Sequence, residues 1–141
     1  MPIFLPKSCP DIGIQILAMK QIFPSLKYYR NCNVSYWQGE LGTSNSGKYA
    51  NLYQVKIIYK YKKSPKVFII SPAIHQDAPH RYPDGSLCLH YPKDRDWKYN
   101  SIIAKTIVPW ACEWFYFYEA WQEYGVWYAD EVPHEKRKIQ E

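Results

Sequence analysis

The chain has 141 residues, of which 47% are hydrophobic and 18% aromatic, including fourteen tyrosines and six tryptophans. This length and composition predict one folded domain with a hydrophobic core, and they exclude a disordered chain. The net charge of +5 is modest and no known nucleic-acid-binding motif accompanies it, so we expect no nucleic-acid partner. Because there is neither a signal peptide nor an apolar run of about 20 residues, we expect a cytoplasmic protein without a membrane partner.

The first predicted element is an amphipathic helix over residues 11–23. Four apolar residues recur at spacings of four, three and four, which places them on one helix face. They are Ile12, Ile16, Met19 and Phe23. Asp11 is expected to cap the helix, and Pro24 is expected to end it.

Strands with short turns are predicted next. The first strand covers Val34–Leu41, and a loop rich in glycine and serine follows over 42–47. In the second strand apolar and polar residues alternate, as expected when one face is buried. Its inward residues are predicted to be Tyr53, Val55, Ile57, Tyr59 and Tyr61. Lys63–Pro65 is predicted to be a turn, and it precedes a third strand over Val67–Ile70 that we expect to be more buried than the first two. Strands joined by such short turns predict an antiparallel meander of three to four strands.

A long irregular segment over 72–96 separates the meander from a second helix over 102–124. The segment holds three of the four histidines, and loops of this length inside a domain are usually functional. Pro109 predicts either a kink in the second helix or a helix start near Val108. Gly125 is the expected C-terminal stop.

The order of these elements indicates an α+β fold in a single domain over residues 1–141. Its core is expected over about 11–125 and includes the aromatic stripe of the second helix. Residues 126–141 are interpreted as a polar C-terminal extension with a frayed end.

Cys88 lies within the irregular segment, in the run Gly85-Ser86-Leu87-Cys88-Leu89-His90. A cysteine between two leucines is often only a small buried hydrophobic residue. A reactive cysteine instead needs a thiolate, and because an ordinary cysteine has a pKa of about 8.5, a neighbour must take its proton. His80 and His90 are the nearby groups that can do so.

The flanking motifs give Cys88 a context. Pro79-His80, the Gly85–Leu89 run, Trp97 and Thr106-Ile107 follow the order of the His-Pro-Asn, Gly-x-(Ile/Leu)-Cys-Leu, Trp and Thr-Ile motifs of ubiquitin-conjugating enzymes. The chain resembles that family over about 11–125, which implies the UBC-like fold. More narrowly, it resembles the stand-alone conjugating-enzyme-like proteins of bacterial short type II CBASS anti-phage systems.

This resemblance implies that Cys88 is the nucleophile and that it accepts the C-terminus of a cGAS-like nucleotidyltransferase as a thioester. The acyl group would then pass to a protein or small-molecule acceptor in anti-phage defence. Two other functions stay open: a catalytically silent adaptor of the same fold that binds the nucleotidyltransferase, and a papain-like hydrolase that cleaves such linkages.

The residues around Cys88 suggest roles in this chemistry. Asp84-Gly85 suits a tight turn, and its peptide N–H groups could stabilise an oxyanion. Asp94 and Asp96 are candidates to orient or deprotonate an attacking lysine, the role that acidic residues have in the resembled family. A substrate-binding role is expected for Tyr82, Asp84, Gly85, Ser86 and Leu87. The family's asparagine after His-Pro has no counterpart, because Arg81-Tyr82 follows His80, and the oxyanion donor is therefore unassigned.

The remaining cysteines and histidines suggest no metal site. His75, His80, Cys88 and His90 are of the ligand types that bind zinc, but their spacing matches no standard arrangement. Cys112 is expected in the core, and Cys9 and Cys32 have no supporting motif, so all four cysteines are predicted to be free thiols. No phosphate-binding glycine loop is present, and we expect no cofactor.

Overall fold

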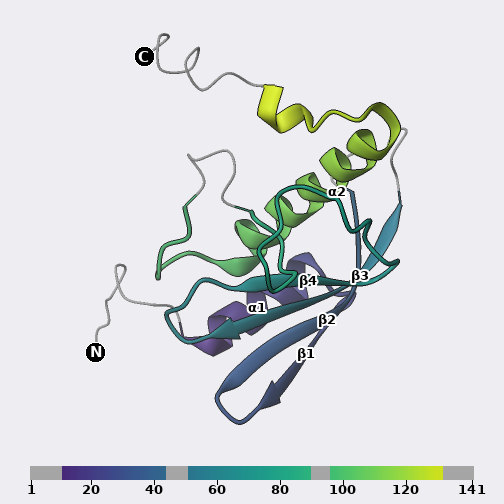
Figure 1. Ribbon diagram of the computed structural model, residues 1–141. Coiled ribbons are helices and arrows are strands. Elements are labelled where there is room, and N and C mark those ends of the chain that lie inside the picture. The colour runs from purple at the N-terminus through teal and green to yellow at the C-terminus, as the bar shows by residue number, and fades with distance from the viewer. Residues whose placement is uncertain (1–10, 44–50, 90–95, 132–141) are drawn as a thin grey trace, which may run out of the picture.

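A four-stranded antiparallel sheet lies beside two helices in the computed structural model, which describes residues 11–43, 51–89 and 96–131 (Figure 1). The elements in chain order are α1 (Ile12–Ile22), β1 (Leu26–Asn31), β2 (Val34–Gly42), β3 (Leu52–Lys60), β4 (Lys66–Ser71), the 3-10 helix η1 (Ile103–Lys105), α2 (Ile107–Tyr124) and the 3-10 helix η2 (Tyr128–Glu131). The predicted α+β class is thereby confirmed.

The sheet has the strand order β1-β2-β3-β4, so each strand pairs with its neighbour in sequence. Alternation along β3 is confirmed, since Tyr53, Val55, Ile57 and Tyr59 are all buried. Register places Trp37 of β2 opposite Ile57, and Ile57 opposite Val67 of β4, which gives a continuous buried row across the sheet. Tyr61 was wrongly assigned to this inward set, because β3 ends at Lys60 and Tyr61 is 61% exposed.

The two outer strands of the sheet differ from the sequence prediction. β1 was not predicted, because the run Leu26–Asn31 buries only Leu26 and therefore lacks a clear alternation of apolar and polar residues. The strand over Val67–Ile70 was predicted to be more buried than the strands before it. This was wrong, since only Val67 is fully buried and Ile70 is 49% exposed. The reason is that Ile70 is skipped in the pairing of β4 with β3, which passes from Ile69 opposite Val55 to Ser71 opposite Gln54, so the strand is irregular at this residue.

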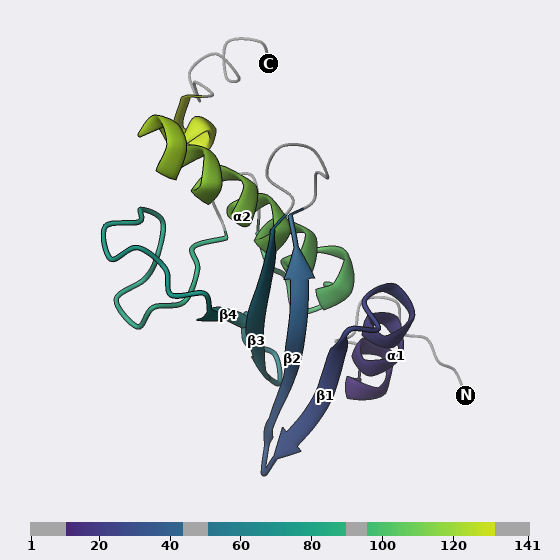
Figure 2. The ribbon, with the colours of Figure 1, turned by 90° about the vertical axis from the view of Figure 1, so that its right-hand side faces the viewer.

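α1 lies beside β1 at one side of the sheet (Figure 2). Its N-cap is the predicted Asp11, whose Oδ1 accepts the peptide N–H of Ile14 over 3.0 Å. Met19 is fully buried, and the other predicted apolar residues are partly buried, so the predicted stripe is confirmed. Gln15 is also fully buried, and its side-chain amide bonds the carbonyl of Ser101 at 3.0 Å and the N–H of Ile103 at 2.9 Å. This polar side chain joins α1 to η1.

α2 crosses one face of the sheet and contributes more buried residues to the core than any other described element (Figures 1 and 2). It begins at Ile107, which confirms the predicted start near Val108. Pro109 therefore lies in the first turn, where a missing N–H breaks no helical hydrogen bond. Gly125 ends the helix in the left-handed conformation at φ 74°, and its N–H bonds the carbonyl of Trp121 at 2.7 Å, as predicted.

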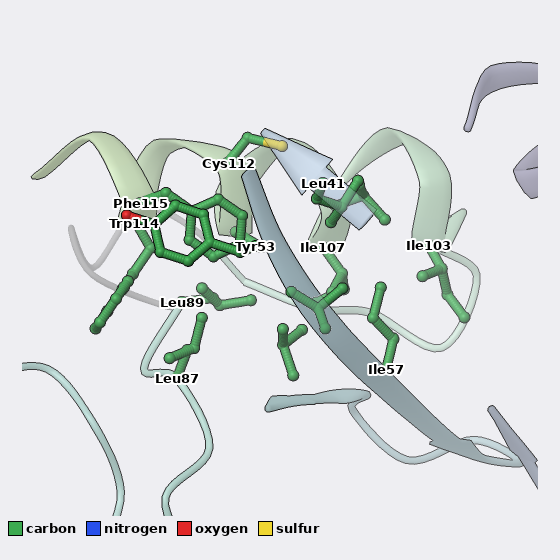
Figure 3. Close-up of a cluster of buried hydrophobic side chains, with 14 of the residues drawn as sticks. Leu41, Tyr53, Ile57, Leu87, Leu89, Ile103, Ile107, Cys112, Trp114 and Phe115 are labelled. Carbon is green, nitrogen blue, oxygen red and sulfur yellow. The ribbon is translucent and has the colours of Figure 1, made fainter. Parts of the chain in front are cut away.

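The hydrophobic cluster between α2 and the sheet also contains the segment that leads to Cys88. Figure 3 shows Leu87 and Leu89 lying near Trp114 and Phe115 of α2. Both leucines are buried, at 4% exposure each. Because these two side chains are fixed in the core, the backbone of the intervening residue is fixed with them.

A buried carboxylate ties α2 to β3 at the far end of this cluster. Glu119 accepts hydrogen bonds from Asn51, at 2.7 Å, and from the hydroxyl of Tyr53. Burial, followed by the hydrogen bond to Glu119, raises the pKa of Tyr53 far above its usual value, so the phenol stays protonated and donates. This contact joins α2 to β3 by a buried side-chain hydrogen bond.

Candidate active site

A tight hairpin over residues 80–88 presents the candidate nucleophile. Arg81 pairs with Leu87, the N–H of Tyr82 bonds the carbonyl of Ser86 at 2.9 Å, and the N–H of Cys88 bonds the carbonyl of His80, also at 2.9 Å. Within the predicted irregular segment, this hairpin is therefore ordered structure.

The tip of the hairpin is the turn that Asp84-Gly85 predicted. The N–H of Gly85 bonds the carbonyl of Tyr82 at 2.8 Å, and Gly85 has φ 92°, a conformation that favours glycine. The N–H of Leu87 bonds the carbonyl of Val67 at 2.9 Å. This last bond anchors the hairpin to β4.

Asp84 fixes the turn through both of its carboxylate oxygens. Its Oδ1 accepts from the N–H and the hydroxyl of Ser86, at 2.9 and 2.6 Å, and its Oδ2 pairs with Lys66 at 2.8 Å. The hydrogen bond from Lys66, followed by those from Ser86, holds the pKa of Asp84 well below its usual range. Asp84 is therefore an anionic structural residue of the turn at neutral pH.

Tyr82 contacts the Cys88 thiol across the hairpin. The register places both residues on the same face as diagonal neighbours, a spacing that a tyrosine side chain can reach. The hydrogen bond between the Tyr82 hydroxyl and Cys88, followed by burial and by the charge of Cys88, raises the pKa of Tyr82 to about 12. The phenol is thus a protonated hydrogen-bond donor beside the sulfur at neutral pH.

His80 lies opposite Cys88 in the register of the hairpin, and three contacts hold it in place. Its carbonyl accepts from Cys88 and from the indole N–H of Trp114, at 3.0 Å, and its ring lies 5.1 Å from that of Trp127. Its φ of 60° is rare for a residue with a side chain and needs such support. This geometry brings a histidine and the half-buried Cys88 together, as the sequence predicted.

Two hollows flank the hairpin. The smaller, of about 10 Å³, has an aromatic wall, and its lining residues are His80, Cys88, Leu89, Trp110, Trp114, Phe117 and Trp127. The larger, of about 490 Å³, lies between the hairpin and the turn before β4. Of the predicted substrate-binding residues, it is lined by Tyr82, Asp84, Ser86 and Leu87.

The other predicted site residues lie elsewhere. Asp96 is an exposed residue just before Trp97, and it takes no part in the hydrogen bonds described for the hairpin. His90 and Asp94 fall outside the described residues. His75 packs against Trp121, with ring centroids 5.6 Å apart, rather than lining the hollow beside Cys88.

The cysteines separate by environment. Cys32, Cys88 and Cys112 carry free thiols, as predicted, and Cys9 lies outside the described part of the chain. Cys112 is buried in the core, as expected, and burial raises its pKa to about 11. Cys32 is exposed in the β1–β2 turn. Within the ranges that the structure describes, no three His, Cys, Asp or Glu side chains cluster as metal ligands would.

Three residues of the site were not predicted as part of it: Lys66, Trp114 and Trp127. Trp114 had been assigned to the core alone, and Lys66 had been interpreted only as one of the outward-facing lysines of the strand pair. Trp127 falls in the extension that was interpreted as polar, which was wrong for its first residues, since Trp127 is 6% and Ala129 5% exposed. The apolar run Val126-Trp127-Tyr128 directly after Gly125 was the available signal.

The order of helix, antiparallel meander, cysteine-bearing segment and long second helix defines the class of the protein: it has the layout of the UBC-like fold. A family model described as Type II CBASS E2 protein matches residues 15–135, and the chain belongs to that family. A search of curated proteins gave no match. Among the described helices, none combines the length and apolarity needed to cross a membrane.

Proposed function

We propose that the protein is a conjugating-enzyme-like acyl carrier of bacterial anti-phage defence. Cys88 accepts the C-terminus of a cGAS-like nucleotidyltransferase as a thioester and passes it to a protein or small-molecule acceptor. The observation that carries this proposal is the hairpin that presents the half-buried Cys88 thiol beside Tyr82 and His80, inside the region that matches the CBASS E2 family.

The chemistry has two steps. In the first, the sulfur of Cys88 attacks an activated C-terminal carbonyl, the activating group leaves with its electron pair, and the thiol proton passes to a base. His80 is the described candidate for that base, and His90 is a second candidate. In the next step an acceptor amine attacks the thioester, a C–N bond forms and the C–S bond breaks. The sulfur leaves as a thiolate, and the proton that the amine gives up restores the Cys88 thiol.

Several neighbours support these steps. Tyr82 donates a hydrogen bond toward the sulfur, and Asp84 holds the turn that fixes Ser86 and the following residues. Asp94 and Asp96 are proposed to orient the acceptor amine. The groove of about 490 Å³ beside Tyr82 is proposed to accommodate the tail of the nucleotidyltransferase.

The test is an intact-mass spectrum of the protein co-expressed with its operon's nucleotidyltransferase. We expect a thiol-labile adduct in the wild type, no adduct in Cys88→Ala, and a stable ester or amide in Cys88→Ser or Cys88→Lys. Cys32→Ala is the matched control, because this thiol is exposed but lies in the β1–β2 turn. It should form the adduct as the wild type does.

Two outcomes would contradict the proposal. Tight binding of the nucleotidyltransferase without any adduct, in wild type and trapping variants alike, would indicate a silent adaptor. Release of a cleaved peptide by the isolated protein would indicate a hydrolase.

A further inference from the structure

Tyr82 lies between the larger groove and the Cys88 thiol. Its side chain lines the groove of about 490 Å³ and is 44% exposed. Its hydroxyl bonds Cys88 across the hairpin, where the register makes the two residues diagonal neighbours on one face. A peptide tail that lies in the groove and is attached to the sulfur therefore has this phenol beside it.

The backbone of Tyr82 is fixed without the help of its side chain. Its N–H donates to the carbonyl of Ser86 at 2.9 Å, and its carbonyl accepts the N–H of Gly85 at 2.8 Å. The N–H of Cys88 is bonded across the same hairpin, also at 2.9 Å. Both ends of the contact thus stand on ordered backbone, so the phenol is held toward the sulfur before any reaction begins.

The other donors of the turn are directed to a different acceptor. The hairpin contains two hydroxyl groups, and that of Ser86 donates to Oδ1 of Asp84 at 2.6 Å. The ammonium group of Lys66 pairs with Oδ2 of the same carboxylate at 2.8 Å. Both of these side chains therefore hold the turn, whereas the hydroxyl of Tyr82 is directed to the sulfur.

We propose that Tyr82 is a catalytic residue of the transfer step, which donates a hydrogen bond to the Cys88 sulfur as the thioester breaks. The inference rests on the proposed function, because it assigns a role in releasing the acyl group from Cys88. When the acceptor amine attacks, a C–N bond forms, the C–S bond breaks, and its electron pair goes to the sulfur. Negative charge therefore develops at the atom that the phenol contacts, and a hydrogen bond to a charged atom is stronger than one to a neutral atom.

The phenol acts as a hydrogen-bond donor and keeps its proton. The hydrogen bond to Cys88, followed by burial, raises the pKa of Tyr82 to about 12. An ordinary cysteine has a pKa of about 8.5, so a thiolate is too weak a base to deprotonate this phenol. The proton that restores the Cys88 thiol is therefore the one that the amine gives up.

The experiment measures how fast a preformed thioester on Cys88 reacts with free lysine. Cys88 is loaded by exchange with a small thioester of acetylglycine, and peptide mass mapping checks which residue is loaded. One variant is Tyr82→Phe, which removes only the hydroxyl. A second protein carries difluorotyrosine at position 82, because fluorination lowers the pKa of a phenol and leaves its shape nearly unchanged.

Tyr29→Phe is the matched control. Tyr29 has a similar exposure, 47%, and its ring stacks on that of Tyr36. It lies in β1, at the opposite edge of the sheet from β4, to which the hairpin is anchored. Loss of this hydroxyl should therefore leave the reaction of the thioester unchanged.

Tyr82→Phe should react with lysine about tenfold more slowly than the wild type, which is the effect of losing one hydrogen bond to a charged group. In the difluorotyrosine protein the rate should fall once the more acidic phenol ionises, because a phenolate has no proton to donate. The wild-type rate should still rise over the same pH range as free amine forms. A tyrosine that only supports the hairpin would not produce this difference between the two pH profiles.

Equal rates in the wild type and folded Tyr82→Phe would overturn the inference, as would an equal loss in Tyr29→Phe. A difluorotyrosine profile that follows the wild type would also overturn it. The chemically loaded thioester does not require the nucleotidyltransferase. If the wild type forms no adduct with that partner, the proposed function fails, while the reaction with lysine still decides the role of Tyr82.

Discussion

The carbonyl of His80 accepts the peptide N–H of Cys88 over 2.9 Å, directly across the hairpin. The same carbonyl accepts the indole N–H of Trp114 over 3.0 Å, so one peptide group joins the candidate nucleophile to α2. Because His80 has a left-handed φ, this junction depends on a backbone conformation that most residues avoid. The position of the Cys88 backbone therefore depends on which residue occupies position 80.

The left-handed conformation of His80 predicts an unequal response to two substitutions. Both His80→Asn and His80→Val remove the imidazole, but asparagine tolerates this conformation and a β-branched residue does not. We expect His80→Val to be less stable than His80→Asn by about 1–2 kcal/mol in urea unfolding. Equal stabilities would contradict the importance of this backbone conformation.

The contact between Tyr82 and Cys88 predicts a shifted phenol titration. The pKa of Tyr82 is raised from 10.0 to about 12. The protonated phenol therefore stabilises the folded state fully below pH 10, and this contribution to stability is lost as the pH rises through about 12. In Cys88→Ala the largest cause is removed, and the pKa should fall toward 10. Carbon-13 NMR of labelled tyrosine, with Tyr82→Phe to assign the signal, measures both values. An unchanged pKa in Cys88→Ala would show that the hydrogen bond is not the main cause.

The hydrogen bonds of Asp84 to Ser86 should affect the rate of adduct formation more than its ion pair with Lys66 does. Asp84→Ala leaves the buried Ser86 without its acceptor, and the misplaced hairpin should slow formation of the Cys88 adduct about tenfold. Asp84→Asn keeps an Oδ1 acceptor and should retain most of the rate. Lys66→Met removes only the exposed ion pair and should have little effect. A Lys66→Met rate as low as that of Asp84→Ala would contradict this division.

Gln15 should contribute to stability although it is polar and buried. Gln15→Leu fills a similar volume but leaves the carbonyl of Ser101 and the N–H of Ile103 without their partner. We expect a loss of about 2–3 kcal/mol in the free energy of unfolding, measured in urea. Gln21→Leu, on an exposed part of the same helix, is the control and should change little. A neutral Gln15→Leu would mean that water replaces the amide.

Gly39 should not tolerate a side chain. A Cβ at this position would lie 2.1 Å from the carbonyl oxygen of Ser25, on a backbone that is fixed by pairing between β1 and β2. Gly39→Ala should therefore cost about 2–3 kcal/mol, since strands β1 and β2 have to separate. Thermal and urea unfolding measure the loss. The neighbouring exposed substitution Gln38→Ala is the control, and equal losses in the two variants would rule out a local clash.

Local patterns in the sequence were sufficient for the elements whose side chains alternate between core and solvent. The stripe of α1, its Asp11 cap, the alternation in β3 and the Gly125 stop were all predicted, because each depends on helix or strand geometry over a few residues. β1 buries only Leu26 and therefore carries no such pattern. The turn at Asp84-Gly85 was likewise predictable, since its hydrogen bonds span only a few residues.

For the site, the sequence by itself determined the motif around Cys88, its nearby histidine and the turn that presents it. Only the tertiary structure decided that Trp114 bonds the carbonyl of His80 and that Trp127 packs on its ring. These partners lie 34 residues or more from His80 in the chain. Their contact depends on how α2 packs over the sheet and where the chain turns after Gly125, and no local spacing encodes that arrangement.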